Sequence, residues 1–274
     1  MTFPNIDPVI FSIGPIHLRW YGLMYVIGFV AAYGLAAWQA KRFGWQVFLD
    51  KLDNLNLALI CGVILGGRLG YVLFYNPGHY LAHPLEIPAT WSGGMSFHGG
   101  CLGAILAGLW YCRRSGLDFR QAADLYVVAA PIGLFFGRIG NFINGELFGR
   151  VSNAPWAMVF PEGGPAPRHP SQLYESLCEG LALFILLWAL KDRPWRQPQP
   201  KIWPHGSMLA LFLVGYGLMR FFLEYTREPD AHLGLLRLGF SMGQWLCLGM
   251  IALGAAFWAW CARRAASPPS QRSK

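Results

Sequence analysis

The sequence predicts an all-α integral membrane protein with about seven transmembrane helices. Of the 274 residues, 54% are hydrophobic and only 13% are charged, whereas roughly a quarter of the residues in a soluble domain are charged. Residues 20–40 and 240–260 contain no charged side chain, and a helix needs about 20 apolar residues to cross a bilayer core. Basic residues gather at alternate ends of the apolar segments, as they do in multi-pass membrane proteins.

Five further segments are apolar but contain isolated polar groups, which brings the expected count to seven. They are residues 55–75 with Arg68, 96–112 with His98, 121–136, 171–190 with Glu175 and Glu179, and 206–222 with Arg220. The Gly-rich segment 96–112 is short for a span, so a re-entrant or interfacial helix is the alternative there. One transmembrane domain is expected over residues 1–274.

The distribution of basic residues predicts the orientation, because Lys and Arg accumulate in cytoplasmic loops. The ends after the first, third, fifth and seventh segments contain 14 of them, and the opposite ends contain four, namely Arg150, Arg168, Arg227 and Arg237. We therefore expect a periplasmic N-terminus and a cytoplasmic C-terminus. The net charge of +8 then reflects topology and contact with membrane lipids, and no nucleic-acid partner is expected. The first 18 residues lack the basic start and cleavage pattern of a signal peptide.

Residues 146–170 are rich in Gly and Pro and are expected to form a small periplasmic head. Several common catalytic patterns are absent from the sequence. The six cysteines form no C-x-x-C pair, and the chain contains no H-E-x-x-H. We therefore expect no metal and no cofactor.

Four arginines, Arg19, Arg68, Arg138 and Arg220, lie inside or at the edge of the predicted spans. An arginine near the bilayer centre costs about 2.5–3.5 kcal/mol on insertion scales, so such residues are usually functional or paired. Snorkelling to the interface is the alternative, mainly for Arg19 and Arg68.

The predicted topology brings polar groups from distant parts of the sequence to the outer leaflet. Arg220 and Glu224 are four residues apart on one helix, so a structural salt bridge between them is an alternative to a binding role. Arg138 and Asn141 share a helix face by their spacing. The whole convergent set is Tyr21, His98, Arg138, Asn141, Glu146, Tyr174, Glu175, Tyr216, Arg220, Glu224 and Arg227.

Two arginines at head-group depth point to a phosphate ligand, because planar guanidinium groups bind phosphate oxygens in pairs. A phospholipid is therefore the expected substrate by position and charge. Histidine ionises nearest neutral pH among the side chains, which makes His98 the candidate general base. A packed, hydrogen-bonded histidine is the alternative for that residue.

Five motifs resemble those of the bacterial prolipoprotein diacylglyceryl transferase family, and they cover almost the whole chain. In chain order they are HLRWYGLMY (17–25), GGMSFHGGCLGA (93–104), GRIGNFINGELFGR (137–150), RHPSQLYE (168–175) and RFFLEYTREPDA (220–231). The resemblance implies an inner-membrane enzyme. It transfers the diacylglyceryl group of phosphatidylglycerol to the lipobox cysteine of preprolipoproteins, whose signal peptide is the second partner, and it releases glycerol phosphate.

The same resemblance implies roles for individual residues. Arg138, Asn141 and Arg220 match phosphate-facing positions, and His98 matches the proposed base. Other residues match positions that the family uses, namely Tyr21, Glu146, Gly149, Glu224 and Arg227. A transporter or flippase that binds an anionic lipid without chemistry is the main alternative, and a structural scaffold is the second. A transporter predicts an internal repeat and a polar path to both faces, and neither is evident in the sequence.

Overall fold

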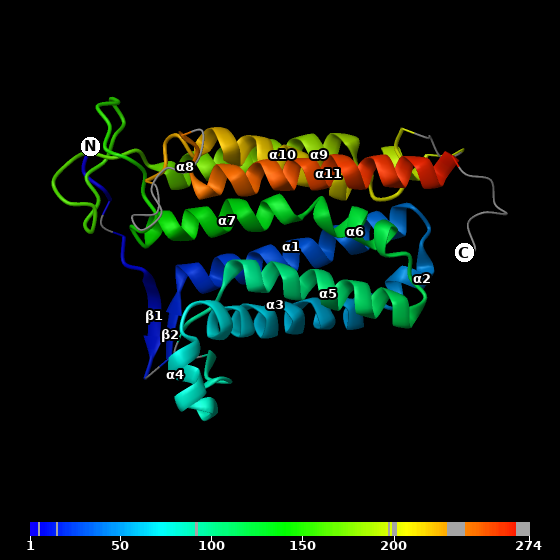
Figure 1. Cartoon of the computed structure of the whole chain (residues 1–274), viewed down its shortest axis with the longest axis horizontal. Helices are drawn as coiled ribbons and strands as arrows, with labels where there is room; N and C mark the ends of the chain where they lie inside the picture. Colours follow the sequence, from blue (N-terminus) through cyan, green and yellow to red (C-terminus); the bar gives the residue numbers. More distant parts are fainter. Residues whose placement is uncertain are drawn as a thin grey trace. The chain divides into compact units, whose positions relative to one another are not determined.

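The computed structural model describes residues 1–266 except 5, 15, 91–92, 197, 199–201 and 229–238. The chain divides into two compact units, one formed by Met1–Ala36 with Ala123–Lys274 and the other by Ala37–Ala122. Figure 1 shows that helices dominate both units. The end of the fifth motif and four of the basic residues counted for orientation, namely Lys201, Arg237, Arg272 and Lys274, lie outside the described residues.

A short hairpin precedes the first helix, so the all-α prediction is wrong for this segment. Strands β1 (Val9–Ile13) and β2 (Ile16–Arg19) pair in antiparallel register, with Phe11 opposite Leu18. Gly14 between them has a φ of 57°, which glycine adopts without steric cost. The Gly-Pro step and the β-branched and aromatic residues of this segment are the sequence features that favour a hairpin.

The unit formed by Ala37–Ala122 contains α2 (Gln46–Leu49), α3 (Leu52–Phe74), α4 (Pro77–Ala82), η1 (Pro84–Glu86) and α5 (Phe97–Ser115). Helices α3 and α5 lie side by side and run antiparallel (Figure 1). Glycines from both helices line the contact between them. A Cβ on Gly66 would overlap the carbonyl oxygen of Gly99, and one on Gly103 would overlap that of Gly62. The glycines spaced by four residues therefore serve helix packing, as small residues do in membrane proteins.

Arg68 is 4% exposed and binds the loop that precedes α5. Its guanidinium donates to the carbonyl oxygens of Glu86 at 2.8 Å, Ile87 at 2.7 Å and Gly93 at 2.6 Å. Because these bonds satisfy the charged group inside the unit, its role is structural, and Arg68 does not need to snorkel.

The other unit contains α1 (Trp20–Arg42) as far as Ala36, and this helix contacts α7 (Ala130–Ile143), where a Cβ on Gly28 would lie 3.1 Å from the Cα of Gly133. Helix α6 (Phe119–Val127) is bent by 42° from α7. Pro131 in the first turn of α7 explains the break in the predicted segment 121–136, because proline cannot donate the hydrogen bond that would continue α6.

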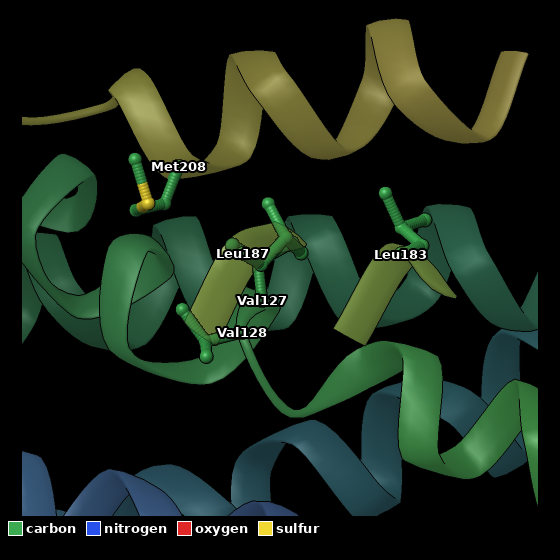
Figure 2. Close-up of a cluster of buried hydrophobic side chains, with 5 residues drawn as sticks. All are labelled: Val127, Val128, Leu183, Leu187 and Met208. Atoms are coloured by element: carbon green, nitrogen blue, oxygen red, sulfur yellow. The ribbon is translucent and has the colours of Figure 1, made fainter. Parts of the chain in front are cut away.

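The remaining helices of this unit are α8 (Ser171–Glu175), the π-helix η3 (Ser176–Ala182), α9 (Leu183–Leu190), η4 (Arg193–Trp195), α10 (Ser207–Leu223) and α11 (Met242–Ala266). Figure 2 shows a buried apolar cluster formed by Val127, Val128, Leu183, Leu187 and Met208. Asp124 of α6 caps α10 by accepting hydrogen bonds from the amides of Gly206 at 2.7 Å and Met208 at 2.9 Å.

Isolated backbone bridges join Val151 and Met158 to Arg168 within residues 146–170, and the N-terminal residues pack on this segment. The N-terminal amine donates to the carbonyl of Ala157 at 2.8 Å, and Thr2 pairs with Val159. The ring of Phe3 lies 5.2 Å from that of Phe160.

Four described helical segments are long and apolar enough to cross a membrane, namely α1, α3, the α8–α9 segment and α11. The bent pair of α6 and α7 raises this number to five if it forms one span. Helices form at all seven predicted segments, and the length and apolarity of four or five of them support a multi-pass membrane protein.

Candidate active site

An ionic cluster lies at the junction of α7, α8 and α10, all within one unit. Its centre is Glu175, the last residue of α8, whose side chain is 1% exposed. Arg138 of α7 reaches its Oε2 with Nε at 2.7 Å. Nη1 of Arg220, on α10, lies 2.8 Å from its Oε1, and Nη1 of Arg227 lies 3.2 Å from the same oxygen. We call Arg138, Glu175, Arg220, Glu224 and Arg227 the arginine cluster.

Glu224 completes the cluster at the end of α10. Its Oε2 lies 2.9 Å from Nη2 of Arg220, so the i, i+4 salt bridge considered from the sequence is present. The other carboxylate oxygen accepts a hydrogen bond from Oγ of Ser241 at 2.9 Å. A Cβ on Gly243 would lie 2.5 Å from Oε1 of Glu224, so this glycine leaves room for the carboxylate.

A second polar network follows directly along the long motif. Nη1 of Arg138 lies 3.5 Å from Oδ1 of Asn141, at the outer limit of a hydrogen bond. Asn141 donates to Oε1 of Glu146 at 2.8 Å, and Asn144 donates to the same oxygen at 3.1 Å. The end of α7 and the turn at Gly145 (φ 69°) thus connect Glu146 to the arginine cluster.

Gly149 is packed between two backbone segments. It pairs with Arg227, and a Cβ at this position would overlap the carbonyl oxygen of Thr226 and lie 3.0 Å from that of His169. Arg150 donates from Nε to the carbonyl of Arg227 at 2.7 Å. The geometry therefore gives Gly149 a backbone role that helps to hold Arg227 in place.

Two other predicted residues lie outside the ion pairs. The hydroxyl of Tyr21 lies 3.1 Å from that of Tyr25, and its ring packs beside Gly140, the residue before Asn141. His98 is the second residue of α5 and is exposed, and it belongs to the other unit. Its proximity to the arginine cluster stays a prediction.

The structure adds two carboxylates to which the sequence analysis assigned no role in the site. Glu175 binds all three arginines, and Glu179 is completely buried in η3 with Oε1 3.7 Å from Nη1 of Arg220. Among the described residues, neither oxygen of Glu179 receives a hydrogen bond. The sequence signal that could have identified them is the presence of two glutamates four residues apart in an apolar segment. Burying an unpaired carboxylate is costly, so such residues are expected to have partners.

Comparison with known proteins agrees with the motifs. A family profile described as prolipoprotein diacylglyceryl transferase (LGT) matches residues 8–260. A phosphatidylglycerol–prolipoprotein diacylglyceryl transferase of Desulfotalea psychrophila is 56% identical over 259 residues, which cover 94% of each chain. Proteins with the same description from Pseudomonas paraeruginosa (51% identical, 98% of each chain) and Geobacter sulfurreducens (50% identical, 98% of this chain and all of the relative) are similar throughout. This chain belongs to the prolipoprotein diacylglyceryl transferase family.

Proposed function

We propose that the arginine cluster is the place where this chain transfers the diacylglyceryl group of phosphatidylglycerol to the lipobox cysteine thiol of a preprolipoprotein. The reaction forms a thioether and releases glycerol phosphate. The observation that carries this proposal is the convergence of three arginines, from α7, α10 and the segment after α10, on one buried carboxylate. Such a group of guanidiniums suits a phosphate ester.

The chemistry needs a thiolate and a stabilised leaving group. The thiol loses its proton, sulfur bonds to the glyceryl carbon, and the bond between that carbon and the phosphate oxygen breaks. The phosphate group becomes more negative as this bond breaks, because its charge changes from −1 in the diester to −2 in the released monoester. Arg138 and Arg220 stabilise that charge, since preorganised donors are most effective where water is scarce. His98 is the proposed acceptor of the thiol proton.

The other predicted residues act around this centre. Asn141 and Glu146 extend the network from Arg138. Glu224 holds one side of Arg220, and Gly149 packs beside Arg227. Tyr21 is proposed to contact the lipid from α1, where it packs next to α7.

We further propose seven membrane spans in the bacterial inner membrane, with α5 and α10 as the two short ones. The N-terminus and residues 146–170 then face the periplasm, where the lipobox of a secreted precursor becomes accessible. The bias of basic residues toward the opposite helix ends supports this orientation, and the signal peptide of the precursor is the second binding partner.

The test is direct transfer by the purified protein in detergent, with phosphatidylglycerol and a lipobox peptide, followed by mass spectrometry of the peptide. We expect a mass gain of one diacylglyceryl group with wild type and none with Arg138→Ala or Arg220→Ala. Lipid binding without any gain in peptide mass would support the flippase alternative. If His98→Gln retains most of the activity, His98 is not the base.

A further inference from the structure

We propose that Glu175 is the positioning residue that aligns the three arginines on the departing phosphate during transfer. This inference rests on the proposed function, and it assigns a role to a side chain outside the predicted set of site residues. Glu175 acts through the arginines, and it is not proposed to touch the lipid or the peptide.

The first argument is the number and direction of its contacts. A carboxylate offers about four acceptor positions on two oxygens, and Glu175 uses both oxygens. Oε2 forms an ion pair with Nε of Arg138 at 2.7 Å, whereas Oε1 accepts hydrogen bonds from Nη1 of Arg220 at 2.8 Å and Nη1 of Arg227 at 3.2 Å. One side chain therefore fixes the separation of three cations that would otherwise repel one another.

The second argument is burial. The side chain of Glu175 is 1% exposed, whereas those of Arg138, Arg220 and Arg227 are 18%, 14% and 21% exposed. The carboxylate thus lies behind the guanidiniums, and the guanidiniums keep an accessible side. A ligand that binds to the exposed side of the guanidiniums therefore contacts the arginines and does not contact Glu175.

The third argument is that some N–H groups of the arginines do not bind Glu175. A guanidinium has five N–H groups. Among the described residues, Nη2 of Arg138 and both Nε and Nη2 of Arg227 make no hydrogen bond or ion pair. These donors come from two different chain segments and are held by one carboxylate, so they are available together for phosphate oxygens.

The local backbone explains why Glu175 is well placed for this task. Ser176, the next residue, donates from Oγ to the carbonyl of Phe135 at 3.1 Å, and Gly180 packs directly on Phe135. These contacts fix α8 and η3 against α7 one turn before Arg138. The carboxylate therefore has a rigid support on the helix that carries its first arginine.

The experiment compares Glu175→Gln with Glu179→Gln. Both variants remove one negative charge from the same helix, but only Glu175 is hydrogen-bonded to the arginines, since Glu179 lies 3.7 Å from Arg220. We measure kcat and KM for phosphatidylglycerol in detergent, and the Kd of glycerol phosphate by calorimetry. Size-exclusion chromatography and thermal unfolding check that each variant is folded.

We expect kcat to fall about 100-fold or more in Glu175→Gln and no more than about tenfold in Glu179→Gln. That difference corresponds to loss of charge-assisted hydrogen bonds. Glycerol phosphate should bind at least as tightly to both variants as to wild type, because each variant lacks one negative charge near the arginines. Equal losses of kcat in the two variants, or a kcat for Glu175→Gln within threefold of wild type, would overturn the proposal.

Glu175→Asp is the alternative test variant if Glu175→Gln does not fold. It keeps the charge but shortens the side chain by one methylene, so we expect kcat to fall about tenfold while the Kd of glycerol phosphate changes less than threefold. Wild-type kcat in Glu175→Asp would contradict the positioning role. Absence of transfer by the wild-type protein would instead contradict the proposed function, so the two failures are distinguishable.

Discussion

Arg220 is the residue with the most demanding geometry in the site. Its Nη1 lies 2.8 Å from Glu175 and its Nη2 lies 2.9 Å from Glu224, so one planar group bridges two carboxylates. A lysine ammonium is a single point donor on a flexible stem and cannot reproduce this arrangement. Charge alone is therefore insufficient at this position.

We predict that Arg220→Lys lowers the rate of thioether formation by about tenfold or more, because one charge-assisted hydrogen bond contributes roughly 1.5–3 kcal/mol. Peptide mass spectrometry measures the rate. Arg42→Lys is the control, since Arg42 lies at the end of α1 over the ring of Trp38 and outside the cluster. A similar decrease in both variants would remove the geometric explanation.

Gly149 permits a second residue-level prediction. Gly149→Ala places a Cβ against the carbonyl oxygens of Thr226 and His169, and such overpacking costs about 1–3 kcal/mol. We expect a lower unfolding temperature in detergent. Gly137→Ala, in the same motif, is the matched control because a Cβ there meets nothing within 4 Å. Equal stability of the two variants would show that the backbone at Gly149 moves freely.

Individual elements were predicted from the sequence to different degrees. The start of the segment 171–190 agrees with α8, and segment 96–112 corresponds to α5, whose N-cap Ser96 accepts from the amide of Gly99 at 3.2 Å. The hairpin and the bend between α6 and α7 were missed. Both depend on local backbone chemistry, at Gly14 and Pro131, that average apolarity does not report.

Only part of the site was predicted, because sequence patterns reveal charged residues and helical spacing but not contacts between distant segments. The arginines were found because a charge in an apolar helix is conspicuous, and Arg220 with Glu224 follows helical spacing. Glu175 was noticed, but its partners are 37 and 45 residues away along the chain, and no periodicity predicts that contact. The placement of Arg68 against loop carbonyls also depends on tertiary structure.

The cap of α10 provides an element-level prediction. Asp124→Ala removes the acceptor for the amides of Gly206 and Met208, so we expect the protein to lose about 2 kcal/mol of stability. Chemical unfolding in detergent measures this loss. Within the described part of the chain, the side chain of the exposed Asp50 accepts a hydrogen bond only from the side chain of Gln46, so Asp50→Ala should change stability by less than about 0.5 kcal/mol. Equal effects would contradict the capping role.

The π-helix η3 provides a second element-level prediction. A π-helix contains one residue more per hydrogen-bonded turn than an α-helix and is frequent at functional sites. Deletion of the exposed Leu177 should restore α-helical spacing while α9 keeps its packing through Leu183 and Leu187. We therefore expect near wild-type thermal stability but at least tenfold slower transfer, because Glu175 moves relative to the arginines.

Deletion of Ile185, which is exposed in α9, is the control for that experiment. It rotates the rest of a regular helix by about 100°, so it should destabilise the protein. Wild-type transfer after deletion of Leu177 would mean that the π-helix is dispensable for the site.

At the scale of the whole molecule, the orientation in the membrane remains to be tested. The bias of basic residues predicts that residues 146–170 lie outside and that the connection between α5 and α6 lies in the cytoplasm. Glu162 is exposed in the first region, and Arg114 is exposed near the end of α5. These two positions therefore report on opposite sides of the membrane.

We predict that Glu162→Cys, in a cysteine-free background, reacts with a membrane-impermeant maleimide in right-side-out spheroplasts. Arg114→Cys should react only after lysis. The opposite pattern would reverse the proposed orientation, and the lipid site would then have to work from the cytoplasm. Labelling of both positions from outside would instead show that the bent α6–α7 segment between them does not cross the membrane, because a true span must separate its two ends.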